Sequence, residues 1–80
     1  MEEIKVKRTK LLSSKNEYRD GVNSPTVINK YRCLCGLGKI VEENVIGFND
    51  HFAYIKCKLC LLKYQSFVDF CGDEWIVYKK

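Results

Sequence analysis

The chain has 80 residues, which is enough for one small domain and too few for two. Apolar residues make up 46% of it and aromatic residues 12%, a folding composition that excludes a disordered tail. The formal net charge is +4, which permits a polyanionic partner without requiring one. Five residues are cysteine, and a chain this short buries little surface, so a metal or a disulfide is expected to supplement its core.

No run of residues approaches the roughly 20 consecutive apolar residues of a membrane span. The first eight residues also lack the basic-then-apolar order of a secretory signal. We therefore expect an intracellular, cytoplasmic protein that does not bind membranes. Thiols stay reduced in that compartment, so clustered cysteines there indicate metal or redox chemistry more than disulfides.

Residues 1–25 are expected to form a basic arm that packs on the rest of the chain or leads into it. Ile4 and Val6 alternate with charged residues, which is typical of an edge strand. The segment Ser14-Lys15-Asn16-Glu17 has the capping-box pattern and predicts a short helical turn. Asn23-Ser24-Pro25 predicts a turn that ends the arm.

Positive charge is concentrated in the first part of the chain. Residues 1–32 hold eight bases and four acids, whereas residues 33–80 hold six of each. In a strand, Lys5 and Lys7 would share one face while Arg8 and Lys10 share the other, so the pattern suits a solvated edge strand as well as a phosphate-binding strip. The candidate residues for binding nucleic acid or another partner are Lys5, Lys7, Arg8, Lys10, Lys30 and Arg32.

Residues 26–80 have a β pattern. Short segments rich in β-branched and aromatic residues are mostly bounded by turn formers, and Gly72-Asp73-Glu74 predicts a hairpin between the last two. Gly47-Phe48-Asn49-Asp50 predicts a loop between the second and the third of the expected strands. We therefore expect one small all-β or β-rich domain with an antiparallel sheet and at most one short helical turn. The expected strands lie within 26–28, 39–42, 52–56, 64–70 and 75–78.

Four cysteines form two close pairs. Cys33 and Cys35 are separated by one residue, and 21 residues later Cys57 and Cys60 are separated by two. Zinc takes four soft donors at tetrahedral corners, and two turns that each carry a pair can supply them. Gly36 suits this arrangement because a residue without Cβ lets the backbone turn tightly beside a thiolate. The sequence thus predicts one structural Zn²⁺.

Two other interpretations of the cysteines stay open. They could be buried free thiols that act as small hydrophobic side chains, or a disulfide or redox pair. A redox CxxC would open a helix, whereas residues 61–64 lead into a strand pattern. Cys71 and His51 are the spare ligands that could replace a member of the first pair. We expect Cys71 to be a packed thiol and His51 to lie in a surface loop.

The segments Cys33-Leu34-Cys35-Gly36 and Cys57-Lys58-Leu59-Cys60 resemble the two knuckles of the zinc-ribbon class. The resemblance covers about residues 30–80 and implies antiparallel hairpins around one zinc ion. The chain departs from the usual pattern in its first pair, where one residue and not two separates the cysteines. Alternation in a straight strand would let Cys33 and Cys35 converge with Leu34 on the opposite side.

Four thiolates would close the coordination shell of zinc, and no other segment has a catalytic motif, so we expect no enzyme and no small-molecule substrate. The leading hypothesis is a non-catalytic zinc module that binds a macromolecule, with nucleic acid or a nucleic-acid-processing enzyme favoured. In size the chain is similar to small bacterial and phage zinc-ribbon proteins, which implies the alternative of a protein inhibitor or regulator, for example of host transcription or CRISPR defence. A thiol-redox switch is the third hypothesis.

Overall fold

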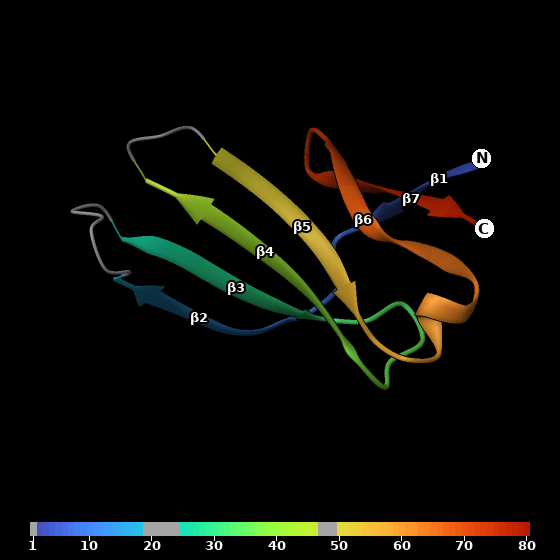
Figure 1. The fold of residues 1–80 in the computed structure, drawn as a ribbon, viewed down its shortest axis with the longest axis horizontal. Helices are drawn as coiled ribbons and strands as arrows, with labels where there is room; N and C mark the ends of the chain where they lie inside the picture. Colours follow the sequence, from blue (N-terminus) through green and yellow to red (C-terminus); the bar gives the residue numbers. More distant parts are fainter. Residues whose placement is uncertain (1, 19–24, 47–49) are drawn as a thin grey trace.

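The computed structural model describes residues 2–18, 25–46 and 50–80 (Figure 1). Within these residues the chain forms one antiparallel sheet in the order β1-β7-β6-β5-β4-β3-β2. This confirms the expected β-rich fold class. The elements are β1 (Glu3–Lys7), β2 (Leu11–Glu17), β3 (Thr26–Arg32), β4 (Lys39–Val45), β5 (Asp50–Lys56), the 3₁₀ helix η1 (Cys60–Leu62), β6 (Tyr64–Cys71) and β7 (Glu74–Lys79).

The sheet is folded over on itself. β1 and β2 follow each other in the sequence but lie at opposite edges, so residues 8–10 must bridge the two edges. Within the described chain, the register of β5 with β6 covers two residue pairs, Ala53 with Val68 and Tyr54 with Phe67. The sheet therefore divides there into a group of β2 to β5 and a group of β6, β7 and β1, which Figure 1 shows at an angle to each other.

The hydrophobic core cluster lies on the face of the sheet that carries Trp75 and Ile40, here called the inner face, whereas Val41 and Glu43 are buried on the opposite face. Ile40, Trp75 and Val77 are completely buried there, together with Ile55 and Val68 from the neighbouring strands. Each buried aliphatic side chain contributes about 1.5–3 kcal/mol to folding. The opposite side of the sheet is here called the outer face. Because side chains alternate along a strand, residues next to these core positions point to it.

The arm differs from expectation in one element. The capping-box segment 14–17 does not form a helical turn but belongs to β2, where Ser14 pairs with Asn29 of β3. The prediction was wrong because β2 is exposed along its whole length, so pairing with a neighbouring strand satisfies its backbone where a helix would have had no apolar face to bury. Ile4 and Val6 do lie in an edge strand, as predicted.

Turns behave as expected where the structure describes them. Gly72 has a φ of +63° in the hairpin between β6 and β7, a backbone conformation that glycine adopts without a steric penalty. The predicted turn at residues 23–24 and the loop at residues 47–49 lie outside the described residues. Helical structure within the described residues is confined to η1, and none of it has the length and hydropathy to cross a membrane.

Candidate metal centre

The first cysteine loop joins β3 to β4. The N–H of Cys33 donates to the carbonyl of Gly38 at 3.0 Å, and the N–H of Gly36 donates to the carbonyl of Cys33 at 2.9 Å. These bonds reverse the chain within a few residues. Gly36 makes this possible because its φ of +83° lies in the left-handed region that favours glycine.

Gly38 has a different role, which the sequence did not reveal. A Cβ at this position would lie 2.3 Å from the Cβ of Cys57 and 2.9 Å from its Cα. Such distances are far below van der Waals contact, and one of the two atoms belongs to the backbone. The two cysteine loops therefore approach each other closely enough that position 38 has no room for a side chain.

The second cysteine loop follows β5 and contains η1. The N–H of Leu61 donates to the carbonyl of Cys57 at 3.0 Å, and the N–H of Lys63 donates to the carbonyl of Cys60 at 3.0 Å. This turn holds Cys57 and Cys60 on its inner side, and both are buried. In Figure 1 it lies directly beside the first loop at one end of the molecule.

The two loops bring the four cysteines together. The sulfur atoms of Cys33, Cys35, Cys57 and Cys60 all lie within 4.8 Å of one another. The Sγ atoms of Cys33 and Cys60 are 2.8 Å apart, and those of Cys35 and Cys57 are 3.4 Å apart. A tetrahedral zinc site with Zn–S bonds of about 2.3 Å separates its sulfurs by about 3.8 Å, so this cluster can hold a metal ion after small adjustments.

The thiols of the cluster differ in their surroundings. Burial raises the pKa of Cys33 and of Cys60. The pKa of Cys35 is lowered to about 7, mainly because the backbone N–H of Leu37 points at its sulfur and secondarily because of the Cys57 thiol. Cys35 is the exposed member of the cluster, and the other three are buried. Backbone N–H groups aimed at a thiolate favour the ligating form.

The two spare ligand candidates lie elsewhere in the described chain. His51 belongs to β5 and not to a loop; its Nε2 is 3.3 Å from Oε1 of Glu42, and its ring stacks on Phe70 with the ring centres 4.2 Å apart. Cys71 is half-buried at the end of β6. Neither residue joins the four-cysteine cluster.

A buried carboxylate that was not predicted from the sequence lies on the inner face. Glu42 is 4% exposed, and its Oε2 accepts from Arg8 Nε at 2.8 Å and from Trp75 Nε1 at 2.7 Å. The guanidinium of Arg8 also lies over the ring of Phe70. Glu42 lies two residues after Ile40, and side chains two residues apart in a strand point to the same face. This spacing was the sequence signal that places Glu42 on the inner face.

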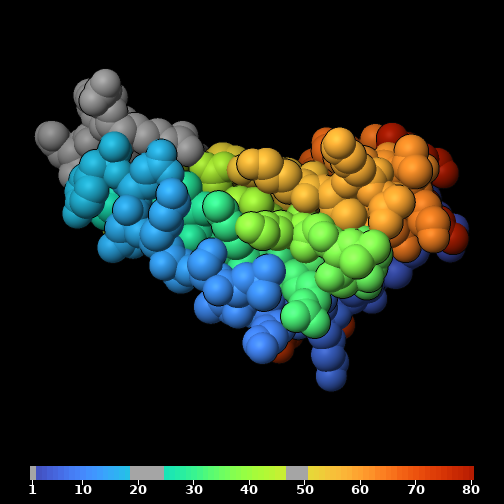
Figure 2. Space-filling model, turned by 90° about the horizontal axis from the view of Figure 1, so that it is seen from below, coloured from blue at the N-terminus to red at the C-terminus, as the bar shows by residue number. Residues whose placement is uncertain are grey.

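The predicted binding cations divide among several places. Arg8 points to Glu42, whereas Lys5 and Lys7 lie in the edge strand β1. Lys10 is exposed in the bridge between β1 and β2, and its carbonyl accepts from the N–H of Arg32. Figure 2 shows this bridge in blue beside the green residues of the first cysteine loop. Lys30 and Arg32 lie in β3, on the outer face.

Three cations form a row across the outer face that the sequence did not reveal. Arg32 of β3 pairs in register with Lys39 of β4, which pairs with Lys56 of β5. All three side chains are exposed. This basic row (Arg32, Lys39, Lys56) lies next to the metal centre, because Cys33 follows Arg32 and Cys57 follows Lys56 in the chain.

Aromatic side chains lie on the same outer face. Phe52 and Tyr54 alternate with Lys56 along β5, and Tyr54 pairs in register with Phe67. The rings of Phe67 and Tyr78 are 5.1 Å apart, and the Tyr78 hydroxyl donates to Asp69. Phe52 and Phe67 are both exposed. The outer aromatic group is therefore Phe52, Tyr54, Phe67 and Tyr78.

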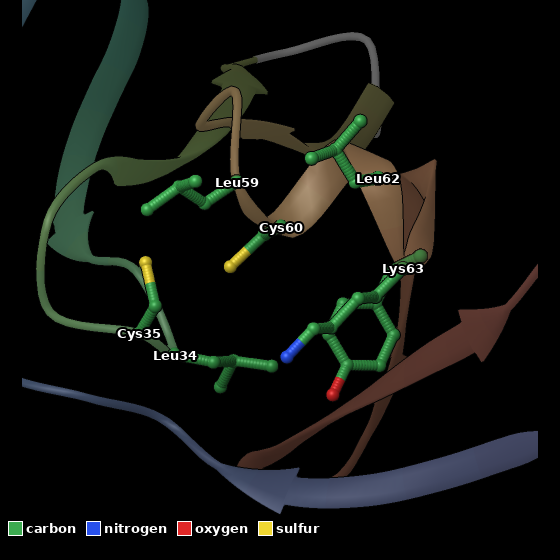
Figure 3. Close-up of a pocket in the computed structure, with 7 residues that line it drawn as sticks. Leu34, Cys35, Leu59, Cys60, Leu62 and Lys63 are labelled. Carbon is green, nitrogen blue, oxygen red and sulfur yellow. The ribbon is translucent and has the colours of Figure 1, made fainter.

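A hollow of about 360 Å³ adjoins the metal centre (Figure 3). Figure 3 shows the sulfur atoms of Cys35 and Cys60 directed into it, with Leu34 on one side and Leu59 and Leu62 on the other. This leucine hollow is lined by Leu34, Cys35, Leu59, Cys60, Leu62, Lys63 and Tyr64. Cys33 and Cys57 do not line it, so the hollow opens from the Cys35 and Cys60 side of the cluster toward the leucines.

Comparisons with known proteins agree with the metal centre and give no family. No protein-family model and no solved structure matches the chain. Over 50 residues the chain is 32% identical to the RING finger protein Z of Sabia mammarenavirus (isolate Human/Brasil/SPH114202/1990). The similarity covers 62% of this chain and 48% of that protein, so the chain spans about half the length of the curated relative it matches. RING fingers are among the folds that structural zinc sites stabilise.

Proposed function

We propose that this protein is a non-catalytic zinc module that binds single-stranded nucleic acid on its outer face. The observation that carries the proposal is the basic row, three exposed cations side by side on a face that also bears aromatic rings. Like charges directly opposite each other on adjacent strands destabilise a sheet. A polyanion bound across the row would offset that cost.

Zinc would act as the structural element of this module. Thiolates are the donors that zinc prefers in structural sites, and Cys33, Cys35, Cys57 and Cys60 would fill all four positions. A closed shell leaves no position for a substrate or a reactive water, so the ion would not act as a Lewis acid. Its role would be to hold the ends of β3 and β5 together, and with them the cations of the basic row.

The charge distribution around the metal centre supports a polyanionic partner. Residues 30–41 and 51–68 contain the four cysteines, the basic row and three further lysines, but no aspartate or glutamate. Four thiolates with one zinc ion carry a charge of about −2, which compensates only part of this surplus. The cysteine end of the molecule therefore stays positive when the metal is bound.

The outer aromatic group supports a single strand over a duplex. Exposed rings can stack with unpaired bases, and each such contact contributes about 1–3 kcal/mol without regard to sequence. Phe52 and Phe67 are exposed at positions where a single-stranded nucleic acid bound to Lys56 could place its bases. A duplex keeps its bases stacked inside and would contact the row with its phosphates alone.

Binding to fluorescently labelled oligothymidylate, followed by fluorescence anisotropy at several salt concentrations, tests this function. We expect the logarithm of the affinity to fall linearly with the logarithm of the salt concentration, with a slope of about −0.7 for each phosphate contacted. Replacing the whole row by Arg32→Gln, Lys39→Gln and Lys56→Gln should make the slope less steep by about 2. Phe52→Ala and Phe67→Ala should weaken binding and leave the slope unchanged.

A matched control uses two exposed cations away from the row. The double variant Lys79→Gln, Lys80→Gln removes the same charge as Lys39→Gln, Lys56→Gln and should bind nearly as well as the wild type. Equal losses in the two double variants would mean that net charge alone matters. Absence of binding by the zinc-loaded wild type at low salt would refute the proposal.

A further inference from the structure

We propose that the leucine hollow beside the metal centre is a docking site for an acidic segment of a partner protein, which inserts one apolar side chain into it. This inference is independent of nucleic-acid binding, because the hollow and the outer aromatic group are different surfaces. It rests on exposure, shape and charge at the cysteine end of the molecule.

Leucines of the two cysteine loops are unusually exposed. Leu62 is 75% exposed and Leu59 is 50% exposed in the second loop, and Leu37 is 78% exposed in the first. The metal centre explains why loops exist at this end, but it does not require apolar side chains that point to solvent. Leu59 and Leu62 line the same hollow and so form contiguous exposed apolar surface, which on a small protein marks an interaction site.

The shape of the hollow suits one inserted side chain. Its volume of about 360 Å³ lies near the lower end of the range for ligand sites, and Leu34 and Tyr64 form partly buried walls. Leu59 and Leu62 project at its rim (Figure 3). An apolar residue of a partner would bury itself between these side chains, as anchor residues do at the centre of protein interfaces.

Charge identifies the kind of partner. Lys63 lines the hollow, and Lys58 lies one residue before Leu59 in the same loop; both are exposed. Because residues 51–68 contain no acidic side chain, no carboxylate of this loop competes for these lysines. A partner segment with carboxylates on both sides of its apolar residue would match apolar surface and lysines together. A nucleic acid could pair with the lysines but would leave the leucines exposed.

The test is a titration of isotope-labelled, zinc-loaded protein with a synthetic peptide, followed by NMR chemical shifts. The probe is a short acetylated peptide in which a central Leu-Phe pair, either residue of which can supply the inserted side chain, is flanked by Asp and Glu. We expect shifts confined to residues 34–37 and 58–64. Two matched peptides should bind at least about tenfold more weakly, one with Asn and Gln in place of the acids and one with Ser in place of the apolar pair.

Variants of the protein separate the two contributions. Leu59→Ser with Leu62→Ser should weaken peptide binding by about tenfold or more, whereas Leu11→Ser with Leu12→Ser, a control at exposed leucines of β2, should not. Lys58→Gln with Lys63→Gln should weaken binding and reduce its salt dependence. The two lysine substitutions alter only exposed charges. Peptide binding by that variant therefore still tests the inference if the leucine variants lose zinc or fold poorly.

Three results would overturn the inference. One is the absence of any shift at peptide concentrations up to about 1 mM. Another is equal binding of the acidic and the neutral peptide. The third is binding to phosphatidylserine vesicles without binding to the peptide, which would identify the surface as a membrane contact. Absence of oligothymidylate binding by the zinc-loaded wild type would not affect any of these outcomes, so the two proposals can fail separately.

Discussion

The indole N–H of Trp75 donates to the carboxylate of Glu42 at 2.7 Å inside the fold. Trp75 belongs to β7 and Glu42 to β4, so the bond joins the two groups of strands across the inner face. Arg8 reaches the same carboxylate oxygen from the bridge between β1 and β2. One side chain thus fixes three segments that are distant in the sequence.

Removal of this carboxylate should destabilise the protein strongly. Glu42→Ala leaves the half-buried guanidinium of Arg8 and the buried indole N–H of Trp75 without their partner, and each hydrogen bond lost to a charged group costs about 1.5–3 kcal/mol. Chemical denaturation followed by Trp75 fluorescence measures the loss. The control is Glu3→Gln, an exposed carboxylate in β1, which should change stability by less than about 0.5 kcal/mol. Similar effects of the two substitutions would contradict this account of the core.

The ligand set can be checked by native and denaturing mass spectrometry of the same samples. We expect one zinc ion per chain under native conditions, which is lost in Cys33→Ser and in Cys57→Ser. Cys71→Ser serves as the matched control and should keep the ion, because Cys71 lies outside the four-cysteine cluster. A folded chain that never carries metal would remove the basis of the module, because binding of a structural metal is coupled to folding.

The two glycines of the first cysteine loop should respond differently to alanine. Gly38→Ala places a Cβ 2.3 Å from Cys57 Cβ and 2.6 Å from its Sγ, so the loops must separate and zinc affinity should fall by about tenfold or more. Gly36→Ala meets no atom within 4 Å but keeps a φ of +83°, which costs about 1–2 kcal/mol of stability. Competition with a chromogenic chelator measures the affinity, and equal zinc affinities in the two variants would show that the close approach at Gly38 has no effect.

Reversal of the middle charge of the basic row should stabilise the sheet while it weakens nucleic-acid binding. Lys39→Glu places a carboxylate between Arg32 and Lys56, which converts two repulsive cross-strand pairs into attractive ones. Such pairs contribute about 0.2–1 kcal/mol each. Thermal unfolding should show a higher midpoint, whereas Lys80→Glu, at a position outside the strands, should not raise it. A lower midpoint of thermal unfolding in Lys39→Glu would mean that the three cations of the basic row do not destabilise the sheet by repulsion.

Alkaline titration should detect the bond between Tyr78 and Asp69. The Tyr78 hydroxyl donates to Asp69, and this bond raises the pKa of Tyr78 from 10.0 to about 12. A raised pKa in the folded state favours the neutral form, so the contribution to stability is complete below pH 10.0 and is lost as the pH rises through about 12. Absorbance at the phenolate band should show late-ionising tyrosines, because burial also raises the pKa of Tyr31, and Asp69→Asn should make Tyr78 alone ionise earlier. An unchanged titration curve in that variant would exclude the bond.

Local patterns were sufficient to predict the strands β1 and β3 to β7, but not β2, and to predict the close approach of the cysteine pairs. Alternation and β-branched residues indicate strands over a few residues, and ligand spacing indicates a metal site, because both depend on neighbours in the chain. The Cys33 and Cys35 pair meets the second pair despite its short spacing. Its loop turns at Gly36 and packs at Gly38, and this compensates for the missing residue.

Long-range relationships could not be predicted in this way. The capping-box motif at Ser14 does not form a helical turn, because Ser14 pairs with Asn29 of β3. Asn29 is too distant in the sequence for a local pattern around Ser14 to include it. The basic row depends on the register of three strands, since Arg32, Lys39 and Lys56 are spread along the sequence. The sequence indicates Arg8 as a candidate for binding nucleic acid or another partner, and its contact with Glu42 follows only from the folding of the sheet over itself.

The pairing of β1 with β7 has a consequence for the order in which the protein can fold during synthesis. Among the described strands, β1 is synthesised before the other six, and its neighbour in the sheet, β7, is synthesised after them. The N-terminal strand must therefore wait unpaired until residue 79 has emerged, and its alternation of Ile4 and Val6 with charged residues keeps this waiting segment soluble. β7 thus completes both this sheet and the placement of Arg8, so a nascent chain that stops before β7 would lack the closed fold.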